Sequence, residues 1–320
     1  MAIAASRAEG VSERPPASQR LALVGLGIAT VGWASAFIVG KFVLAEMTPL
    51  AVATWRYAFA SLMLAPFALR TGARPTSAIG DPPVPSASPW RAVLPVIRPL
   101  AVMIVAGGVF YPWLFLSALN RTSATNTSLL IALNPVLTLV LTPLIGEHLE
   151  RRRMLGAGLA FAGAIVVITA GNPARLAALE LNLGDLLAVV AAACWASFNL
   201  ASRSVLGRVA PSVANCAVYA GGFVALFLLA EDPLGQLARA TPFAIAGIAA
   251  MALLSSVIAG QLFLIGVRAT GVGRAVVFVY LVPVLTAALS VPLLGEPFTL
   301  AQVAGGCGVL AGLWLATDVG

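Results

Sequence analysis

The chain has little charge for its length. Of its 320 residues only 10% are charged, whereas 60% are hydrophobic, and an ordinary soluble domain carries about a quarter charged residues. A large water-exposed surface needs more charge than this, so a large soluble fold is excluded. The apolar runs are instead long enough to cross a bilayer, which takes roughly 20 residues for each helix.

Residues that carry metal or redox chemistry are also scarce. The chain holds one histidine, His148, and three cysteines, Cys194, Cys216 and Cys307. The cysteines lie within apolar runs and show no CxxC or CxxH spacing, which favours packing over metal binding. His148 lies in a predicted loop, where a solvated side chain is the simpler interpretation than a metal ligand. We therefore expect no metal and no cofactor.

The placement of the basic residues and the lack of catalytic motifs argue against two classes of function. The net charge of +7 comes from basic residues scattered over the loops, and without a basic stripe it does not indicate nucleic acid as a partner. No Ser/His, paired-Asp or GxxxxGK[ST] pattern points to an enzyme, although a membrane enzyme or scaffold stays the alternative from another class. No carboxylate lies at the middle of a predicted span, so an obvious proton relay is not expected.

Apolar runs bounded by charge, proline and glycine predict an all-α integral membrane protein with ten transmembrane helices. Three of their starts carry helix-capping residues: Thr48 before Pro49, Thr241 before Pro242, and Thr299 in a capping box. The predicted spans are 21–44, 49–69, 98–119, 123–145, 153–171, 184–205, 211–230, 242–264, 274–294 and 300–317.

Basic residues indicate the orientation of these helices. On alternate loops, fourteen of the nineteen Lys and Arg residues fall on the side of the N-terminus and four on the other, with Arg56 inside a span. Because cytoplasmic loops retain positive charge, both termini are predicted in the cytoplasm, with 1–20 as a polar tail and the proline-rich segment 70–97 as a flexible loop. Lys41 is the only lysine. This preference for arginine over lysine is typical of a GC-rich bacterial genome, so we expect the protein in a bacterial inner membrane.

The two halves of the chain resemble each other. WASAFIVGK at 33–41 matches WASFNLASR at 195–203. PVLTLVLTPLIGE at 135–147 matches PVLTAALSVPLLGE at 283–296 with one residue inserted, and a glycine-rich helix follows each copy. Three matches in the same order indicate a duplication.

The duplication predicts an inverted repeat. Each half, 21–171 and 184–317, holds five predicted helices, and because five is odd the second copy must enter the membrane from the opposite face. Such repeats provide an inward-open and an outward-open conformation around a site near the midplane.

Four segments carry a resemblance to a known family: GWASAFIVGK, TWRYAFASLMLAP, NPVLTLVLTPLIGEHL and LGAGLAFAGAIVVI. In this order they resemble the EamA-type transporters of the drug/metabolite transporter superfamily. The resemblance implies ten helices around a central cavity and a secondary transporter or facilitator. Export of amino acids or similar small metabolites is the leading expectation, and a drug or phosphorylated-metabolite carrier is the alternative. The expected partners are a small-molecule substrate and the bilayer; monomer and homodimer both stay open.

Polar and aromatic residues inside spans are candidates for substrate contact, because polar groups are costly there. Trp33 and Phe37 share one helix face, as do Trp195 and Asn199. The repeat makes these faces symmetry mates, which are either opposite walls of a cavity or packing surfaces. The main candidates are Trp33, Phe37, Arg56, Tyr111, Asn134, Trp195, Asn199, Tyr219, Gln261 and Tyr280, and Tyr57 and Trp113 are further candidates of the same kind.

Two cations lie in the first helical hairpin. Lys41 and Arg56 are predicted at similar depth, about 10 Å below the outer surface by helical rise. They either attract an anionic substrate, or Lys41 snorkels outward and Arg56 binds backbone carbonyls at a helix end.

Prolines, glycines and two glutamates carry further expectations. Pro135 and Pro283 predict bends inside the fourth and ninth spans, interpreted as static bends with a hinge as the alternative. Glu147 and Glu296, each after a glycine, are expected to serve the start of the next helix. Small residues of the last and fifth spans favour close packing inside the bundle over a dimer interface: Gly158, Gly163, Gly308 and Gly312.

Overall fold

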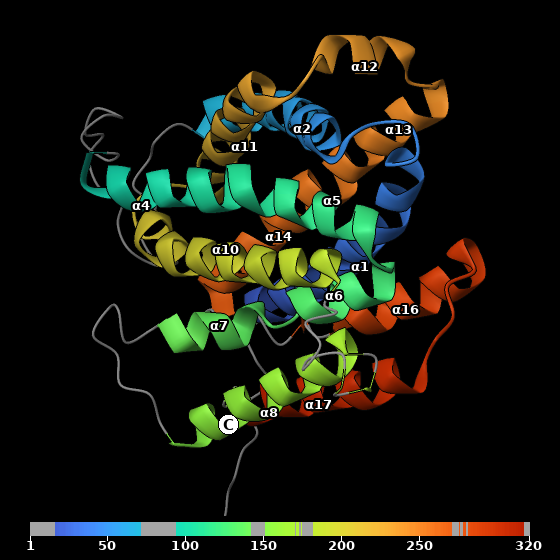
Figure 1. Cartoon of the computed structure of the whole chain (residues 1–320). Helices are drawn as coiled ribbons and strands as arrows, with labels where there is room; N and C mark the ends of the chain where they lie inside the picture. Colours follow the sequence, from blue (N-terminus) through green and yellow to red (C-terminus); the bar gives the residue numbers. More distant parts are fainter. Residues whose placement is uncertain are drawn as a thin grey trace, which may run out of the picture.

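The computed structural model describes residues 17–71, 94–141, 151–169, 171–172, 174, 182–270, 275, 278–279 and 281–316. Helix is the regular secondary structure of these ranges (Figure 1). This follows from the apolar sequence, since in lipid a helix satisfies its own backbone hydrogen bonds. Most of the expected tail 1–20 and of the expected loop 70–97 lies outside the described residues.

The first half of the chain forms a set of helices that ends with α8. A short 3₁₀ turn, η1 (Leu94–Val96), precedes a continuous rod whose middle part, η2, is π-helical. The helices are α1 (Ala17–Val43), α2 (Pro49–Thr71), α4 (Ile97–Val102) continued by η2 (Met103–Phe110) and α5 (Tyr111–Arg121), α6 (Ala124–Ile131), α7 (Asn134–Leu141) and α8 (Arg151–Ile168).

The second half has a corresponding set, again with a rod whose middle part, η4, is π-helical. One short helix, α12, joins two longer ones and was not predicted. The helices are α10 (Leu183–Leu206), α11 (Pro211–Leu229), α12 (Pro233–Arg239), α13 (Pro242–Met251) continued by η4 (Ala252–Ile258) and α14 (Ala259–Thr270), α16 (Leu281–Leu294) and α17 (Leu300–Ala316).

Six helical segments of the described part are long and apolar enough to cross a membrane. They fall on six of the predicted spans and run over Leu21–Val43, Pro49–Arg70, Ile97–Arg121, Leu183–Leu206, Pro211–Leu229 and Pro242–Thr270. Three shorter apolar helices fall on three further spans, over Met154–Val167, Leu281–Leu294 and Leu300–Gly312. Large side chains on these helices stay exposed, Leu62 and Leu228 at 70% and 78%, as a surface toward lipid requires.

The predicted span 123–145 is not one helix. It is divided into α6 and α7 by a turn at Ala132 and Leu133. Pro135 stands in the first turn of α7, where its missing N–H costs nothing, and the Asn134 amide donates to the carbonyl of Ile131 at 3.0 Å. The proline therefore opens a new helix here instead of bending a continuous one. Pro283 likewise lies in the first described turn of α16.

The predicted helix starts are confirmed by their capping bonds. The Thr241 hydroxyl accepts from the backbone N–H of Ala244 at 3.2 Å. In the capping box of α17, the Gln302 side chain accepts from the N–H of Thr299 at 2.8 Å, and the Thr299 hydroxyl accepts from the N–H of Gln302 at 3.2 Å. These bonds satisfy N–H groups that the first turn of a helix leaves without an intrahelical acceptor.

The two halves are interleaved rather than laid side by side. The most extensive helix contacts in the described residues all join one half to the other: α8 with α17, α2 with α11, α1 with α14, and α5 with α10 (Figure 1). α1 and α10 are the first helices of the two halves. Each packs against the rod of the other half, α1 against α14 and α10 against α5, so the two contacts are equivalent under the repeat. The core is therefore shared between the halves.

The largest of these contacts, α8 with α17, is made through glycine. A Cβ atom at Gly163 would lie 2.6 Å from the carbonyl oxygen of Gly305, and one at Gly308 would lie 3.1 Å from the Cα of Gly163. The two backbones thus touch directly, as small residues allow in membrane helices. Gly158 has nothing within 4 Å of such an atom and takes no part. The expectation of close packing inside the bundle is correct for Gly163, Gly308 and Gly312, the last of which lies against the backbone of Gly156 and Ala160.

Candidate functional site

A cluster of aromatic rings fills the middle of the bundle where α1, α5 and α10 meet. Trp195 lies with its ring centroid 4.6 Å from that of Tyr111, 4.7 Å from Phe198 and 6.1 Å from Trp33. Trp33 in turn contacts Phe263 at 5.2 Å. Tilted and edge-to-face pairs of this kind are favourable. The predicted symmetry mates Trp33 and Trp195 are thus neighbours in space.

One side of this cluster borders an enclosed cavity of about 30 Å³. Room of this size admits roughly one or two water-sized groups. Its walls come from both halves of the chain, and among the described residues that line it none is acidic. The lining residues are Trp33, Arg56, Tyr57, Gly107, Tyr111, Trp195, Phe198, Asn215, Val218, Tyr219, Ser255, Ser256, Gly260, Phe263 and Leu264.

Arg56 of α2 reaches this cavity from one wall. Its side chain is 5% exposed, and its Nε donates to the hydroxyl of Ser256 at 2.9 Å. Its guanidinium carbon stands 5.7 Å from the ring centroid of Tyr57 and 6.0 Å from that of Phe115, which gives weak cation–π stabilisation. The predicted alternative that Arg56 binds carbonyls at a helix end does not apply to Nε, because its acceptor is a side chain of the other half.

The π-helical segment η4 supplies acceptors to the opposite wall. The indole N–H of Trp33 donates to the carbonyl of Ser255 at 3.1 Å, and the Tyr219 hydroxyl donates to that of Ser256 at 2.7 Å. In the corresponding segment η2, the carbonyl of Gly107 accepts from the hydroxyl of Tyr57 at 3.1 Å. π-helical turns free backbone carbonyls from the regular ladder and recur at functional sites.

Two donors on the cavity wall have no hydrogen-bond acceptor among the described residues. They are Nη1 of Arg56 and Nδ2 of Asn215, which is 2% exposed. A buried N–H group without an acceptor is costly. These two atoms therefore mark a place where an acceptor from outside the chain would be stabilised.

A second small cavity, also of about 30 Å³, lies on the other side of the aromatic cluster. Trp33, Tyr111 and Trp195 line both cavities. Asn134 lines the second one, and its side-chain oxygen accepts from the Asn199 amide at a long 3.4 Å. The remaining residues that line it are Phe37, Ile131, Val279 and Val282.

Most of the predicted site residues thus meet around the two cavities. Asn199 is buried behind Asn134 and lines neither of them, and Gln261 donates to the carbonyl of Pro211 at 3.3 Å away from the lining. Tyr280 lies outside the described residues. The main candidates that line a cavity are Trp33, Phe37, Arg56, Tyr111, Asn134, Trp195 and Tyr219.

Sequence reasoning missed several residues of the first cavity, among them Asn215, Ser255, Ser256 and Phe263. Asn215 is a lone amide within an apolar helix, the same signal that singled out Asn199, and it was available. Ser255 and Ser256 gave no such signal, since serine is common in membrane helices, and Phe263 looks like any other apolar residue.

Lys41 does not join Arg56. Its ammonium group donates to the carbonyl of Thr122 in the α5–α6 turn at 2.7 Å, so of the two predicted cations only Arg56 lines the cavity. The Thr122 hydroxyl in turn donates to Asp185 at 2.7 Å. We call the residues that surround this turn the turn cluster: Lys41, Thr122, Asn126, Asp185, Glu296 and Gln302.

Glu296 serves a different helix from the one expected. Its carboxylate accepts from the N–H groups of Ala124 at 2.8 Å and Thr125 at 3.3 Å, at the start of α6. A carboxylate is favourable at a helix N-terminus, but the helix belongs to the other half of the chain. The expectation that Glu296 serves the next helix, α17, is wrong, because Thr299 and Gln302 already cap that one. Its counterpart Glu147 lies outside the described residues.

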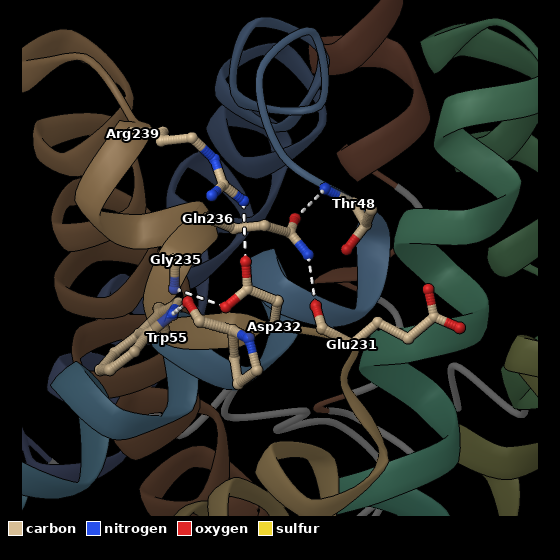
Figure 2. A network of polar contacts seen from close by, with 8 residues as sticks. Thr48, Trp55, Glu231, Asp232, Gly235, Gln236 and Arg239 are labelled. Carbon is tan, nitrogen blue, oxygen red and sulfur yellow. Dashed lines mark hydrogen bonds and ion pairs between the residues drawn. The ribbon is translucent and has the colours of Figure 1, made fainter.

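A further polar network ties α12 to the α1–α2 connection (Figure 2). The Gln236 side chain accepts from the N–H of Thr48 at 2.9 Å and donates to the carbonyl of Glu231 at 2.7 Å. The indole of Trp55 donates to the carbonyl of Pro233 at 2.9 Å. α12 is thereby held across the end of α2.

Asp232 begins α12 and is its N-cap. Its backbone is left-handed, with φ 45°, its carboxylate accepts from the N–H of Gly235 at 3.0 Å, and Arg239 lies 2.9 Å away as an ion pair (Figure 2). The bonds from Arg239 and Gly235 lower the pKa of this carboxyl below its ordinary value of 3.8. Asp232 followed by Pro233 is a helix-start signal that would have found α12 in the sequence.

A family model matches nearly the whole chain. The EamA-like transporter family matches residues 20–169 and again residues 182–317. The two matches fall on the two sets of helices described above.

Several relatives match most of the chain. The "Uncharacterized transporter YyaM" of Bacillus subtilis is 26% identical over 93% of this chain and 92% of its own length. An "Uncharacterized transporter" of Archaeoglobus fulgidus is 27% identical over 91% of this chain and 96% of its own length. A third relative, named "Probable terminal-alkyne amino-acid exporter", from Streptantibioticus cattleyicolor, is 29% identical over 60% of this chain and 63% of its own length.

A solved crystal structure shares the fold. It superposes with a TM-score of 0.59 over 93% of this chain and 96% of that chain, at 21% identity. At this identity the likeness concerns the fold alone.

Proposed function

The chain belongs to the EamA-like transporter family, and from this premise we propose that it is a secondary transporter that exports amino acids or similar small metabolites by alternating access. It is a multi-pass membrane protein with two EamA domains. The family consists of transporters and not of enzymes, which removes the membrane enzyme or scaffold from consideration.

The proposed topology is ten helices in two inverted five-helix repeats, 21–171 and 184–317. The observed helices and the two family matches support this division. The charge bias of the loops supports a cytoplasmic location for both termini in a bacterial inner membrane. In this topology the turn cluster and α12 lie at the outer end of the bundle.

One observation carries the proposal: the enclosed cavity lies between the halves and has aromatic rings and polar donors in its wall. A transport site must be reached alternately from both sides, and inverted repeats provide two such states around one site. Trp33 and Arg56 come from the first half, and Trp195 and Asn215 from the second. A movement of one half against the other therefore changes access to the same group of residues.

The contacts at the outer end support an outward-closed state for this structure. Glu296 of the second half bonds the start of α6 in the first half, and Lys41 and Asp185 from different halves both meet Thr122. An outward-open state requires these bonds to break. Hydrogen bonds at this end can be replaced by hydrogen bonds to water at little net cost in free energy, so such a contact can open and close.

Two observations favour amino acids among the possible substrates. A cation and an amide on the cavity wall suit the carboxylate of an amino acid, and the aromatic rings beside them suit an apolar side chain. The relative from Streptantibioticus cattleyicolor is named as a probable exporter of an amino acid.

Flux through proteoliposomes tests this function. Vesicles that contain the purified protein, loaded with each of the common amino acids, should show counterflow of at least one of them, and protein-free vesicles should show none. A nucleoside, a sugar phosphate and a cationic drug serve as other substrate classes. Counterflow of the drug or the sugar phosphate alone would replace the amino-acid assignment by the alternative carrier. The absence of counterflow for all of them would overturn the proposed function.

A further inference from the structure

The first cavity contains a pair of donors that no described residue of the chain uses. Arg56 and Asn215 are 95% and 98% buried, yet Nη1 of the one and Nδ2 of the other have no acceptor among the described residues. They come from α2 and α11, which pack along each other. Both residues line the same cavity.

Arg56 and Tyr219 both bond Ser256. Nε of Arg56 donates to the Ser256 hydroxyl at 2.9 Å, and Tyr219, one helical turn from Asn215, donates to the Ser256 carbonyl at 2.7 Å. A Cβ atom placed on Gly260 would lie 3.5 Å from Nδ2 of Asn215. The same atom would meet the Tyr219 hydroxyl, so the missing side chain of Gly260 leaves room for that hydroxyl beside the Asn215 amide.

The acceptors of the wall are already occupied. The carbonyls of Ser255 and Ser256 accept from Trp33 and Tyr219, and the carbonyl of Gly107 accepts from Tyr57. What is left on the wall is a cation and an amide N–H. No acidic residue is among the described lining residues to balance the cation, and a buried charge without a partner is strongly unfavourable.

We propose that Arg56 and Asn215 form a subsite for the carboxylate group of the substrate. This inference rests on the proposed function and names the chemical group that the cavity selects. A carboxylate brings two acceptor oxygens and one negative charge, which match two donors and one cation, and charge-assisted bonds of this kind are the strong ones. A phosphate brings more charge than a single arginine balances.

The second cavity determines how the bound molecule is oriented. The carboxylate cavity is about 30 Å³, sized for a headgroup, and it shares Trp33, Tyr111 and Trp195 with the second cavity. The substrate's apolar part therefore lies against these three rings, on the side of Phe37 and Asn134. The subsite accordingly selects molecules with a carboxylate at one end and a compact apolar group beside it.

The test compares acids with their amides on the purified full chain in detergent. Binding of each common L-amino acid and of its C-terminal amide is measured by the quenching of tryptophan fluorescence, since Trp33 and Trp195 lie at the site. The best amino acid should bind at least tenfold more tightly than its amide, because the amide loses the negative charge and one acceptor. Inorganic phosphate is titrated in parallel.

Variants assign this preference to the two residues. In Arg56→Met and in Asn215→Leu the ratio of amide to acid dissociation constants should fall toward one. Arg56→Lys should keep part of the preference, since it keeps the charge without the planar fork. Gly260→Ala should weaken binding of the acid because its methyl group meets the Tyr219 hydroxyl and lies beside the Asn215 amide. Gly158→Ala, with nothing within 4 Å, should bind like the parent chain. Gly260→Ala also keeps the test decisive if the Arg56 variants do not fold.

The possible outcomes separate the subsite from the proposed function. Equal binding of acid and amide, together with amino-acid counterflow, would overturn the subsite and leave the function standing. Phosphate binding that depends on Arg56, without any amino-acid binding, would overturn both the carboxylate and the amino-acid assignment. An acid preference that survives in Arg56→Met and Asn215→Leu would place the carboxylate elsewhere.

Discussion

The indole rings of Trp33 and Trp195 meet edge to face, with centroids 6.1 Å apart and planes at 84°. They occupy equivalent places in the two copies of the repeat, so the centre of the bundle is built where the copies meet. Each ring also borders both cavities. Changes at this pair should therefore affect the substrate path more than the fold.

Replacement of Trp195 by Ala should reduce transport at least tenfold. The change removes ring contacts with Trp33, Tyr111 and Phe198 at the wall of both cavities. Because Trp195 is only half-buried, the loss of stability should stay below the roughly 3–5 kcal/mol of a fully buried Trp. Trp195→Phe should fall between Ala and the parent. Flux is normalised to the amount of folded protein measured by size-exclusion chromatography. If transport and folded protein fall in equal proportion, the ring has a packing role only.

Glu296→Gln should weaken the contact between the halves. The carboxylate accepts from two N–H groups at the start of α6, and loss of a charged cap costs about 1 kcal/mol. We expect the apparent melting temperature in detergent to fall by roughly 2–4 °C. Glu231→Gln is the control, because only the backbone carbonyl of Glu231 enters the network around α12 (Figure 2). An equal fall in both variants would contradict the assigned role.

Gly163→Ala should destabilise the chain, whereas Gly158→Ala should not. A methyl group at Gly163 would lie 2.6 Å from the carbonyl oxygen of Gly305, so α8 and α17 must separate, at a cost of about 1–3 kcal/mol. At Gly158 the same group meets nothing within 4 Å, and the change should be neutral or stabilise by up to about 1 kcal/mol. Thermal unfolding of the two variants side by side measures this. Equal melting temperatures would contradict the described packing.

The stability of α12 should fall at low pH. The Asp232 carboxyl has a pKa below 3.8 because Arg239 and Gly235 donate to its charged form. A lowered folded-state pKa gives stability that is present above the unfolded-state value of about 3.9 and is lost as the pH falls through the lower folded value. Amide exchange of Gly235 and Gln236, corrected for the intrinsic rate, should accelerate in this window. Asp232→Asn should exchange fast at neutral pH and show no such acceleration.

Cysteines introduced at Arg74 and Asp318 should be labelled only from the cytoplasm. This follows from the proposed topology, which places the loop 70–97 and the C-terminus on the positively charged side. An impermeant maleimide is applied to intact cells and to inverted vesicles, in a background without Cys194, Cys216 and Cys307. Labelling of either position in intact cells would overturn the ten-helix topology.

Hydropathy and capping residues predicted most of the fold. The predicted starts at Pro49 and Pro242 are the observed starts of α2 and α13, and Thr299 caps α17 as predicted. The division of the fourth span at Ala132 and Leu133 was missed because hydropathy does not distinguish one apolar helix from two. α12 was missed because it is short and polar.

Less of the site than of the fold could be predicted from the sequence. The repeat singled out Trp33 and Trp195, and the cost of charge in lipid singled out Arg56, and all three line the first cavity. Sequence spacing does not determine the direction of an isolated side chain, so Gln261 was chosen as a candidate and Asn215 was not, although only Asn215 lines that cavity. For the same reason the sequence left two interpretations open for Lys41, whose acceptor is the carbonyl of Thr122, 81 residues away.

The bonds of Glu296 also affect how the chain is made. A ribosome releases the first turn of α6 long before it reaches the glutamate, because Ala124 and Glu296 are 172 residues apart. Until the end of translation, the N–H groups of Ala124 and Thr125 lack the carboxylate of Glu296. The first half is therefore made before this carboxylate can bond the start of α6. A first half expressed alone should lack these bonds until the second half is supplied.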